Sequence, residues 1–267
     1  MHPSDRLSWT IARHVASMPQ GTIFAASACA VAGVRLSQEL LGCRLHLCGR
    51  GGAYDLRGSL ALHARYWLFN RRPHAHVDLS GVFDTLSEPH ALVATPAQVD
   101  GAGNANLSGI GDYAHPKVAF GGTRGLPDAG TLHFVLPAHS ARQLVRQADF
   151  VSTCAATRER PALLFTDLCV MRWHAPARQW RLEAVAPGAD AGTVRARTGF
   201  DFVEADAVVA LEDPSAAALS LLESIDPFGL RELDFVRDRT AQLDAIARVY
   251  EREANIVGRH VVPNRPV

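Results

Sequence analysis

The chain has 267 residues, of which 48% are hydrophobic and 20% are charged, and its 27 basic residues balance its 27 acidic ones. These values are typical of a globular protein that is long enough to bury a large core, as one α/β domain or as two smaller ones. The balanced charge, with no block of lysine or arginine, argues against nucleic acid and anionic lipid as partners. We therefore expect a small molecule or another protein as the partner.

The compartment is suggested by the apolar segments and by the cysteines. The most apolar stretch, residues 22–34, is too short to span a bilayer, and the N-terminal segment lacks the basic and apolar regions of a signal peptide. The five cysteines are scattered and form no closely spaced pair, which argues against a disulfide framework and against a zinc ribbon. We expect a cytoplasmic protein that neither enters a membrane nor holds a metal ion.

The first elements are predicted by hydrophobic periodicity and by the residues that end helices. Leu7, Ile11 and Val15 recur at four-residue spacing, so an amphipathic helix is expected over residues 5–18. The elements that follow in the first hundred residues are a short strand over 21–27, a packed helix over 28–42, a strand that begins at 43 and runs into glycines, and a strand within 88–100.

The middle of the chain is predicted to be rich in strands. A strand is expected over residues 131–140, and a polar stretch then leads into another strand that ends near 154. Residues 161–188 have the pattern of a hairpin, in which two β-rich runs are separated by the turn-forming residues 174–179.

Two helices are predicted near the C-terminus. The first, within residues 212–227, has Asp213 as its N-cap and Pro214 at its first helical position. The second is a long helix with a narrow apolar seam, made of Leu233, Val236, Thr240, Leu243, Ala247 and Tyr250. Because a seam indicates burial without naming the partner, packing on the helix's own domain is favoured over a contact between subunits, and both interpretations stay open.

The order of these elements predicts an α/β fold, with an open mixed sheet covered by helices. Residues 1–230 are expected to form this α/β domain, and residues 231–267 a C-terminal helical extension. Neither an internal repeat nor a low-complexity linker divides the chain.

The segment from Ala97 to Asp112 has an unusual composition for a core strand, because glycine and asparagine are depleted in strands. Asn104 and Asn106 are two residues apart, so on an extended chain both amides face the same side. The glycine cluster that follows, Gly121, Gly122 and Gly125, has backbone amides that are able to form a concave nest for an oxyanion or a phosphate. From spacing alone, a pair of glycine-rich turns with satisfied asparagines is an equally good interpretation.

The residues of this region also carry a resemblance. The run "AQVDGAGNANLSGIGDYAHPKVAFGGTRG" resembles the signature of the β-type subunits of family I coenzyme A-transferases, especially the glutaconate CoA-transferase branch. Further landmarks of that branch recur in the same order, namely "VFD", "FTDLCV", "APG", "RTGFDF" and "SIDPFGLREL". The resemblance spans roughly residues 7–233, and so many ordered matches are far more specific than a lone glycine cluster.

The resemblance implies an open α/β fold of the CoA-transferase type and an active site formed together with a separate α-type subunit. Coenzyme A then enters as part of an acyl-CoA substrate, and no tightly bound cofactor is expected. In the family, a glutamate near the end of an early strand of the β-type subunit attacks the thioester, which gives an acyl anhydride and then an enzyme thioester. The resemblance assigns the oxyanion hole to backbone amides of the glycine-rich segments, here Gly121, Gly122 and Gly125.

The chain departs from this pattern at the attacking glutamate. The segment "GCRLHLCGRGG" matches the strand that bears it, and Cys48 stands in its place, followed by Gly49 and Arg50. The same loss resembles a side branch of steroid-ring-degrading heteromers, which hydrolyse a carbon–carbon bond of a cyclic CoA thioester with a glutamate of the α-type subunit. A small buried residue that fills the vacated site is the favoured interpretation of Cys48, and a thiolate activated by Arg50 is the alternative. Arg50 is equally compatible with a contact to a carboxylate or CoA phosphate and with a solvated loop.

These inferences lead to one functional hypothesis and three alternatives. The chain is expected to be the β-type subunit of a heteromeric enzyme that hydrolyses or ring-opens an acyl-CoA thioester, with Gln98, Asn104 and Asn106 as polar groups of the pocket. The alternatives are a true CoA-transferase whose nucleophile comes from the partner subunit, a non-catalytic scaffold or regulatory subunit, and a homo-oligomer held together by the C-terminal seam.

Overall fold

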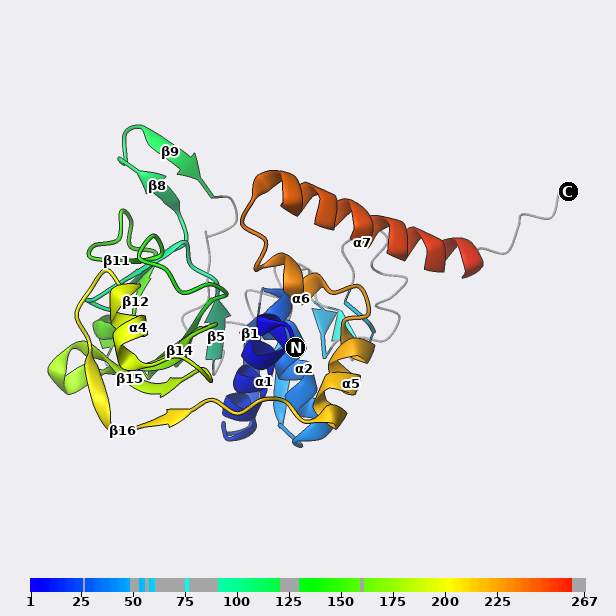
Figure 1. Ribbon diagram of the computed structural model, residues 1–267, viewed down its shortest axis with the longest axis horizontal. Helices are drawn as coiled ribbons and strands as arrows, with labels where there is room; N and C mark the ends of the chain where they lie inside the picture. The colour runs from blue at the N-terminus through cyan, green and yellow to red at the C-terminus, as the bar shows by residue number, and fades with distance from the viewer. Residues whose placement is uncertain are drawn as a thin grey trace, which may run out of the picture.

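A computed structural model of the chain describes residues 1–25, 27–48, 53–55, 58–60, 75–76, 91–120, 130–158 and 161–260. The described residues form an α/β fold with helices packed on a mixed sheet, as the sequence predicts (Figure 1). The main sheet has ten strands in the order β16-β15-β14-β13-β10-β5-β1-β2-β3-β4. Its strands are β1 (Gly21–Ala25), β2 (Leu45–Cys48), β3 (Ala53–Tyr54), β4 (Ala75–His76), β5 (Ala91–Ala94), β10 (Thr131–Leu136), β13 (Ala162–Thr166), β14 (Cys169–His174), β15 (Gln179–Val185) and β16 (Val203–Ala210).

Two smaller sheets and the helices complete the described structure. A four-stranded sheet has the order β11-β6-β7-β12, and β8 pairs with β9 in a separate hairpin. These strands are β6 (Gln98–Asp100), β7 (Asn104–Asn106), β8 (Gly109–Gly111), β9 (Pro116–Ala119), β11 (Leu144–Val145) and β12 (Thr153–Cys154). The α-helices are α1 (Pro3–Ala16), α2 (Ala28–Leu40), α4 (Ala191–Ala196), α5 (Ala216–Ile225), α6 (Leu230–Leu233) and α7 (Arg239–His260).

The centre of the main sheet is parallel. Strands β2, β1, β5, β10 and β13 run in one direction, and β3 and β14 flank them in the opposite direction. Every residue of β5 is buried, as expected for a strand in a parallel sheet that is covered on both faces. The carboxyl ends of the five parallel strands therefore lie along one edge, and this is the edge at which open α/β sheets bind their ligands.

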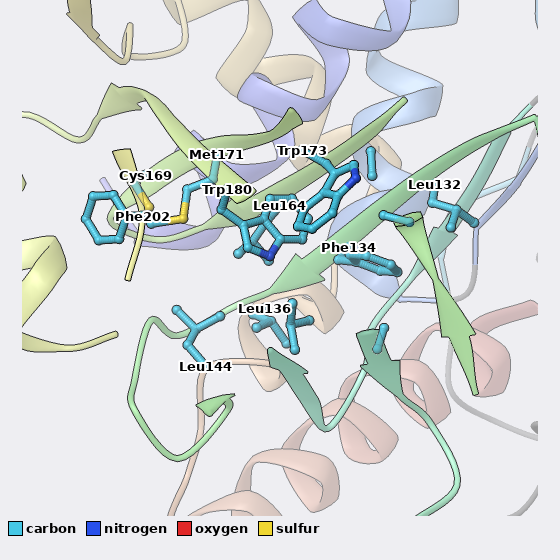
Figure 2. Close-up of a cluster of buried hydrophobic side chains, with 14 of the residues drawn as sticks. Leu132, Phe134, Leu136, Leu144, Leu164, Cys169, Met171, Trp173, Trp180 and Phe202 are labelled. Carbon is cyan, nitrogen blue, oxygen red and sulfur yellow. The ribbon is translucent and has the colours of Figure 1, made fainter. Parts of the chain in front are cut away.

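The two faces of the sheet bury different layers because side chains alternate along each strand. Leu132, Phe134 and Leu136 of β10 face a cluster that includes Trp180 and residues of the second sheet (Figure 2). Val135, which lies between them, faces the opposite cluster, formed with α1 and α2. The sequence predicts this strand because its residues are mostly apolar, as is typical of parallel strands.

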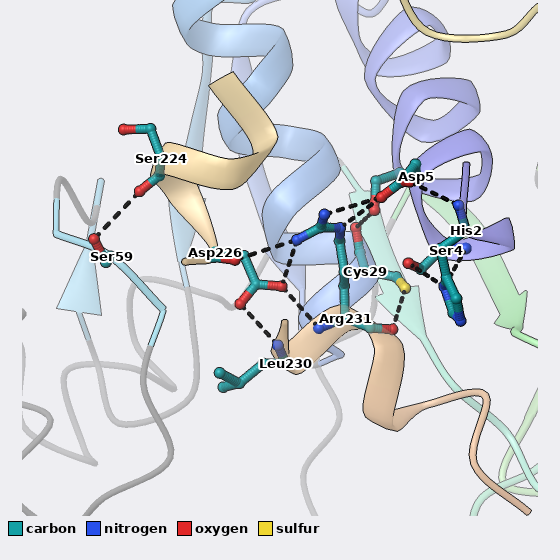
Figure 3. Close-up of polar contacts among 10 residues, drawn as sticks. His2, Ser4, Asp5, Cys29, Ser59, Ser224, Asp226, Leu230 and Arg231 are labelled. Carbon is teal, nitrogen blue, oxygen red and sulfur yellow. Dashed lines mark hydrogen bonds and ion pairs between the residues drawn. The ribbon is translucent and has the colours of Figure 1, made fainter. Parts of the chain in front are cut away.

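A buried ion cluster joins the start of the chain to the segment between α5 and α6. The guanidinium of Arg231 lies 2.9 Å from Oδ1 of Asp5 in α1 and 3.0 Å from Oδ2 of Asp226 at the end of α5 (Figure 3). The Asp226 carboxylate also accepts hydrogen bonds from the backbone amides of Leu230 and Arg231. The short helix α6 is thus held against the start of α1.

The predicted hairpin at residues 161–188 is wrong in its first half. The first of its two β-rich runs consists of two strands, β13 and β14, because a tight turn at Asp167 and Leu168 reverses the chain. Thr166 closes this turn, since its hydroxyl accepts hydrogen bonds from the amides of Leu168 and Cys169. The turn has neither glycine nor proline, so the sequence signal for it was weak.

The predicted cap of the helix after residue 212 is also wrong. Ser215 is the N-cap of α5, and its hydroxyl accepts a hydrogen bond from the amide of Ala218. Asp213 instead accepts a hydrogen bond from the side chain of Arg6 in α1. Serine and aspartate are both favoured at N-caps. The side chain of Asp213 is engaged by Arg6 of α1, and Ser215 caps the helix. The sequence analysis also missed the strand β16 and the helix α4.

The long C-terminal helix is interrupted, and the part of its predicted apolar seam that lies on α7 faces outward. A break at residues 234–238 separates α6 from α7. On α7, Leu243 is 58% exposed and Tyr250 is 40% exposed, whereas Val249 is buried against α2 and α5. The seam is therefore split: its first residue, Leu233, packs on its own domain against the core of α2 and α5, whereas Leu243 and Tyr250 are exposed. A role of the exposed part in contact between subunits stays a prediction, as does the domain boundary at residue 230. Within the described residues, no helix combines the length and apolar character that a membrane span requires.

Candidate functional site

The candidate site is the end of β2, where the sequence places Cys48. This residue pairs with Phe24 of the neighbouring strand β1 and with Tyr54 of β3. Its side chain is 0% exposed, and burial raises the pKa of the thiol to about 11. Within the described surroundings Cys48 is therefore a neutral thiol at neutral pH, and the alternative of a thiolate activated by Arg50 stays a prediction. Arg50, the cation of that alternative, lies outside the described residues.

The acid that lies against the end of β2 is Asp55, and its carboxylate is fully engaged. Oδ1 accepts hydrogen bonds from the amide of Leu47 at 2.8 Å and from Nε2 of Gln38 at 3.0 Å. Oδ2 lies 2.6 Å from Nδ1 of His46. Asp55 is 8% exposed and has a positive φ of 48°, a conformation that aspartate tolerates better than most residues. These contacts make Asp55 an anchor of β2 and leave it poorly suited to attack a substrate.

A second acid lies at the start of α2, which directly follows β1. Ser27 caps this helix by accepting a hydrogen bond from the amide of Ala30. Asp234, in the break after α6, is an exposed residue as a whole, but its carboxyl group lies near Cys29 in the first turn of α2. Burial raises the pKa of Asp234 to about 6, and hydrogen bonds from Cys29 oppose that rise. Sequence reasoning missed Asp234, because only the fold brings residue 234 next to residue 29.

The polar residues of the glycine-rich segment form cross-strand pairs on one face of the hairpin β6–β7. Asn106 lies opposite Gln98, and its Nδ2 donates to Gln98 Oε1 at 2.7 Å. Asn104 donates in the same way to Asp100 Oδ2 at 3.0 Å. Asn104 and Asn106 therefore share a face, as their spacing predicts.

The two amides that are most buried in this segment are used within the protein. Asn106 is 0% exposed; its Nδ2 also donates to the carbonyl of Gly109, and its Oδ1 accepts from the amides of Ser108 and Gly109. Gln98 Oε1 accepts a second hydrogen bond from the amide of Asp149. These contacts match the interpretation of satisfied side chains in glycine-rich turns. A direct role of Gln98, Asn104 or Asn106 in binding a ligand stays a prediction.

Asp100 organises the turn between β6 and β7, a role that the sequence analysis did not assign. Its buried carboxylate accepts hydrogen bonds from the amides of Ala102, Asn104 and Ala148, in addition to the side chain of Asn104. Gly103, in the same turn, has a φ of 82°, and a Cβ atom there would come within 3.1 Å of the Trp173 ring. The aspartate and the glycine are thus both required by the backbone of this turn.

The hairpin β8–β9 projects from the body of the molecule, as Figure 1 shows. Asn106 holds its base through Gly109, and Asp149 accepts a hydrogen bond from the amide of Gly111. Three large hydrophobic side chains on or next to this hairpin are exposed: Tyr113, Val118 and Phe120. The predicted nest of Gly121, Gly122 and Gly125 follows directly and lies outside the described residues.

Comparisons with known proteins agree with the resemblance seen in the sequence. A family model described as coenzyme A transferase matches residues 87–196. A glutaconate CoA-transferase subunit of Acidaminococcus fermentans is 31% identical over 147 residues, which are 49% of this chain and 55% of that protein. The cholesterol ring-cleaving hydrolase IpdB subunit of Mycobacterium tuberculosis is 30% identical over 166 residues, which are 57% of this chain and 66% of that protein. The matched segments thus span between about half and two thirds of these curated relatives.

The fold also has a match among solved structures. The decarboxylase AibA/AibB superposes with a TM-score of 0.73 at 23% identity, covering 86% of this chain and 97% of that one. Four further structures of that decarboxylase carry valine, serine, asparagine or alanine in place of one cysteine. At this level of identity the likeness shows the fold alone.

Proposed function

We propose that this chain is a member of the coenzyme A transferase family and the β-type subunit of a heteromeric enzyme that acts on an acyl-CoA thioester. The relatives with which it shares 30–31% identity are single subunits of a transferase and of a hydrolase. The described site has the features of one half of an active site, because a strand end and a helix start meet at the ligand-binding edge of the sheet.

The reaction that we favour is hydrolysis or ring opening, and the observation that carries this proposal is the state of Cys48. CoA exchange through an enzyme thioester needs a carboxylate that attacks the thioester carbonyl. At the end of β2 stands a buried thiol whose pKa is about 11, and the adjacent acid, Asp55, already accepts three hydrogen bonds or ion-pair contacts. The subunit is therefore better suited to bind and orient the thioester, while a group of the α-type partner activates the water.

The partner has two candidate contact surfaces on this chain. The first is the exposed apolar side of the β8–β9 hairpin, which lies next to the predicted glycine nest. The second is the outward seam of α7, with Leu243 and Tyr250. Apolar side chains that project from the body of a monomer are typical of surfaces that become buried in an assembly.

Decarboxylation is the second candidate function, and the cysteine at the end of β2 is the observation that favours it. The decarboxylase AibA/AibB shares the fold and has been solved with replacements of one cysteine. Loss of carbon dioxide from an acyl-CoA that bears a carboxylate needs no attacking carboxylate. A poorly solvated site destabilises the charged carboxylate, neutral carbon dioxide leaves, and the carbon that keeps the electron pair takes up a proton. A buried neutral thiol is compatible with that chemistry.

One experiment separates these reactions. The chain is co-purified with its α-type partner and incubated with a panel of acyl-CoA thioesters, with and without an acceptor acid. Thioester hydrolysis releases a free thiol, whereas carbon–carbon hydrolysis or ring opening adds the mass of one water to the product. Decarboxylation releases carbon dioxide and leaves the thioester intact. Exchange moves CoA to the acceptor acid. We expect thiol release or addition of water without transfer. Acceptor-dependent transfer would contradict the favoured reaction, and the absence of any turnover across the panel would favour a scaffold subunit.

A further inference from the structure

A pocket distinct from the end of β2 opens at the same edge of the sheet, at the carboxyl ends of β10 and β13. It has a volume of about 560 Å³, within the range of pockets that bind small molecules. Its polar and aromatic lining comes from the loop after β10, the turn after β13, the end of α4 and the break between α6 and α7: His139, Ser140, Asp167, Arg197, Phe235 and Arg237.

The walls of this pocket are held in place by His139. This buried ring bonds to the hydroxyl of Thr166 through Nδ1 and to that of Thr198 through Nε2, at 3.0 and 2.9 Å. Its backbone amide donates to Oδ1 of Asp167 at 2.6 Å. Three segments that are far apart in the sequence are thereby fixed around the pocket before any ligand enters.

Several polar groups of the lining lack a partner among the described residues. The guanidinium groups of Arg197 and Arg237 form neither an ion pair nor a hydrogen bond with a described residue, although both act electrostatically on Asp167. The hydroxyl oxygen of Ser140 is buried and makes no hydrogen bond within the described part of the chain. Burial raises the pKa of the Asp167 carboxyl, and the two arginines oppose that rise.

We propose that this pocket binds the phosphoryl group of a small organic molecule. Two guanidinium groups match the double negative charge of a phosphate ester. A phosphate alone does not fill the volume, and Phe235 offers an apolar surface for the organic part. Free nucleotides and the nucleotide portion of a CoA thioester share this chemistry.

The pocket and the end of β2 are separable in an experiment. Strands β1, β5 and β10 lie between β2 and β13, so the two places are about 19 Å apart at the usual strand spacing. Binding of a phosphorylated probe to the full chain is measured without the partner subunit and without turnover. If the proposed enzymatic function fails, the binding measurement still stands. If the probe does not bind, the proposed enzymatic function is still open to its own test.

The test uses isothermal titration of the full chain with inorganic phosphate, adenosine 5′-phosphate, adenosine and coenzyme A. Arg197→Gln and Arg237→Gln each remove one guanidinium, and Arg44→Gln, an exposed arginine before β2 at the opposite edge of the sheet, is the matched control. We expect adenosine 5′-phosphate to bind and adenosine to bind at least tenfold more weakly. Each pocket variant should weaken binding about tenfold or more, because a charged hydrogen bond is lost, whereas the control should not change it.

Each outcome bears on the proposal. Binding of coenzyme A that weakens in the same two variants identifies the nucleotide of the substrate as the source of the phosphoryl group, and binding of adenosine 5′-phosphate or phosphate alone identifies a separate ligand. Equal binding of adenosine and adenosine 5′-phosphate would overturn the proposal. So would unchanged affinity in the Arg197→Gln and Arg237→Gln double variant, or the absence of binding by every phosphorylated probe.

Discussion

Nδ1 of His46 lies 2.6 Å from Oδ2 of Asp55, and this pair closes the end of β2 beside Cys48. The contact ties a half-exposed ring to a buried carboxylate that also receives the amide of Leu47 and the side chain of Gln38. The acid that lies against the end of β2 is thus part of the scaffold.

Asp55 should be a stabilising residue. We expect Asp55→Ala to lower the free energy of unfolding by about 2 kcal/mol or more, because it leaves the Leu47 amide without its acceptor and introduces a residue that tolerates positive φ poorly. Asp55→Asn keeps one acceptor and tolerates the backbone, so its loss should be smaller. Urea unfolding followed by circular dichroism measures both, and Asp206→Ala at an exposed position is the control. Equal stability of Asp55→Ala and the control would contradict this role.

Arg231 should matter more than any exposed arginine. Arg231→Met removes the cation that neutralises Asp5 and Asp226, and removing one member of a buried ion cluster typically costs about 3–5 kcal/mol. Arg172→Met breaks an exposed pair with Glu183 and should cost less than about 1 kcal/mol. The midpoints of chemical unfolding compare the two variants. A loss below about 1 kcal/mol for Arg231→Met would show that the ion cluster does not hold α6 against the start of α1.

The stability of the chain should fall on acidification. Burial lowers the pKa of His14 and of His139 to about 4, and that of His133 well below its usual value. The unfolded chain takes up protons at these rings near pH 6.5, whereas the folded chain does not, so stability is complete above about pH 6.5 and is lost as the pH falls toward 4. Asp234, with a pKa of about 6, and Asp167, whose pKa is also raised by burial, act in the opposite direction and favour the folded state at low pH, but three histidines outweigh two carboxyls.

His133 tests this account because neither of its ring nitrogens makes a hydrogen bond with a described residue. We expect His133→Leu to raise the free energy of unfolding by about 1 kcal/mol at neutral pH and to flatten the acid dependence, because it replaces an unsatisfied buried polar group with an apolar one. His139→Leu should destabilise instead, since His139 bonds to Thr166 and Thr198. Unfolding series between about pH 5 and 8 give both values. A steeper acid dependence in His133→Leu would refute the assignment.

The β8–β9 hairpin should contact the partner subunit. Val118→Glu places a charge on its exposed apolar side, and we expect it to weaken the complex about tenfold or more while the unfolding midpoint of the chain is unchanged. Val209→Glu, at an equally exposed valine on β16, is the control. Biolayer interferometry with the α-type partner compares the two. Equal affinity of both variants would leave the seam of α7 as the contact surface.

The sequence predicts the centre of the fold because its signals there are local. Mostly apolar runs identify the parallel strands, and the spacing of Asn104 and Asn106 places both on one face. The tight turn at Asp167 is closed locally by Thr166 and has neither the glycine nor the proline that would have marked it. The choice of Ser215 over Asp213 as a cap accompanies the contact of Asp213 with the distant Arg6, so a local pattern did not reveal it. The same holds for the outward seam of α7, because periodicity identifies an apolar face without saying what covers it.

The candidate site was predictable only in part. Cys48 was identified through the family resemblance, whereas its raised pKa follows from burial by neighbouring strands. Asp100, Asp55 and Asp234 were missed, because each acquires its role from backbone amides or helix starts that lie elsewhere in the sequence. The pocket of Arg197 and Arg237 was missed for the same reason: four separate segments contribute to it.

The central claim is that this chain holds a neutral thiol at the position where the resemblance to CoA-transferases predicts an attacking carboxylate. The co-purified complex is incubated with acyl-CoA, treated with borohydride, and the intact mass of this subunit is measured, with Cys48→Glu as the variant that restores a carboxylate and Cys48→Ala as the variant that removes the thiol. The account predicts an unmodified native subunit, turnover in Cys48→Ala within about threefold of the native value, and a trapped CoA thioester, revealed as a reduced glutamate, in Cys48→Glu alone. A borohydride-reduced acidic residue in the native subunit would contradict it.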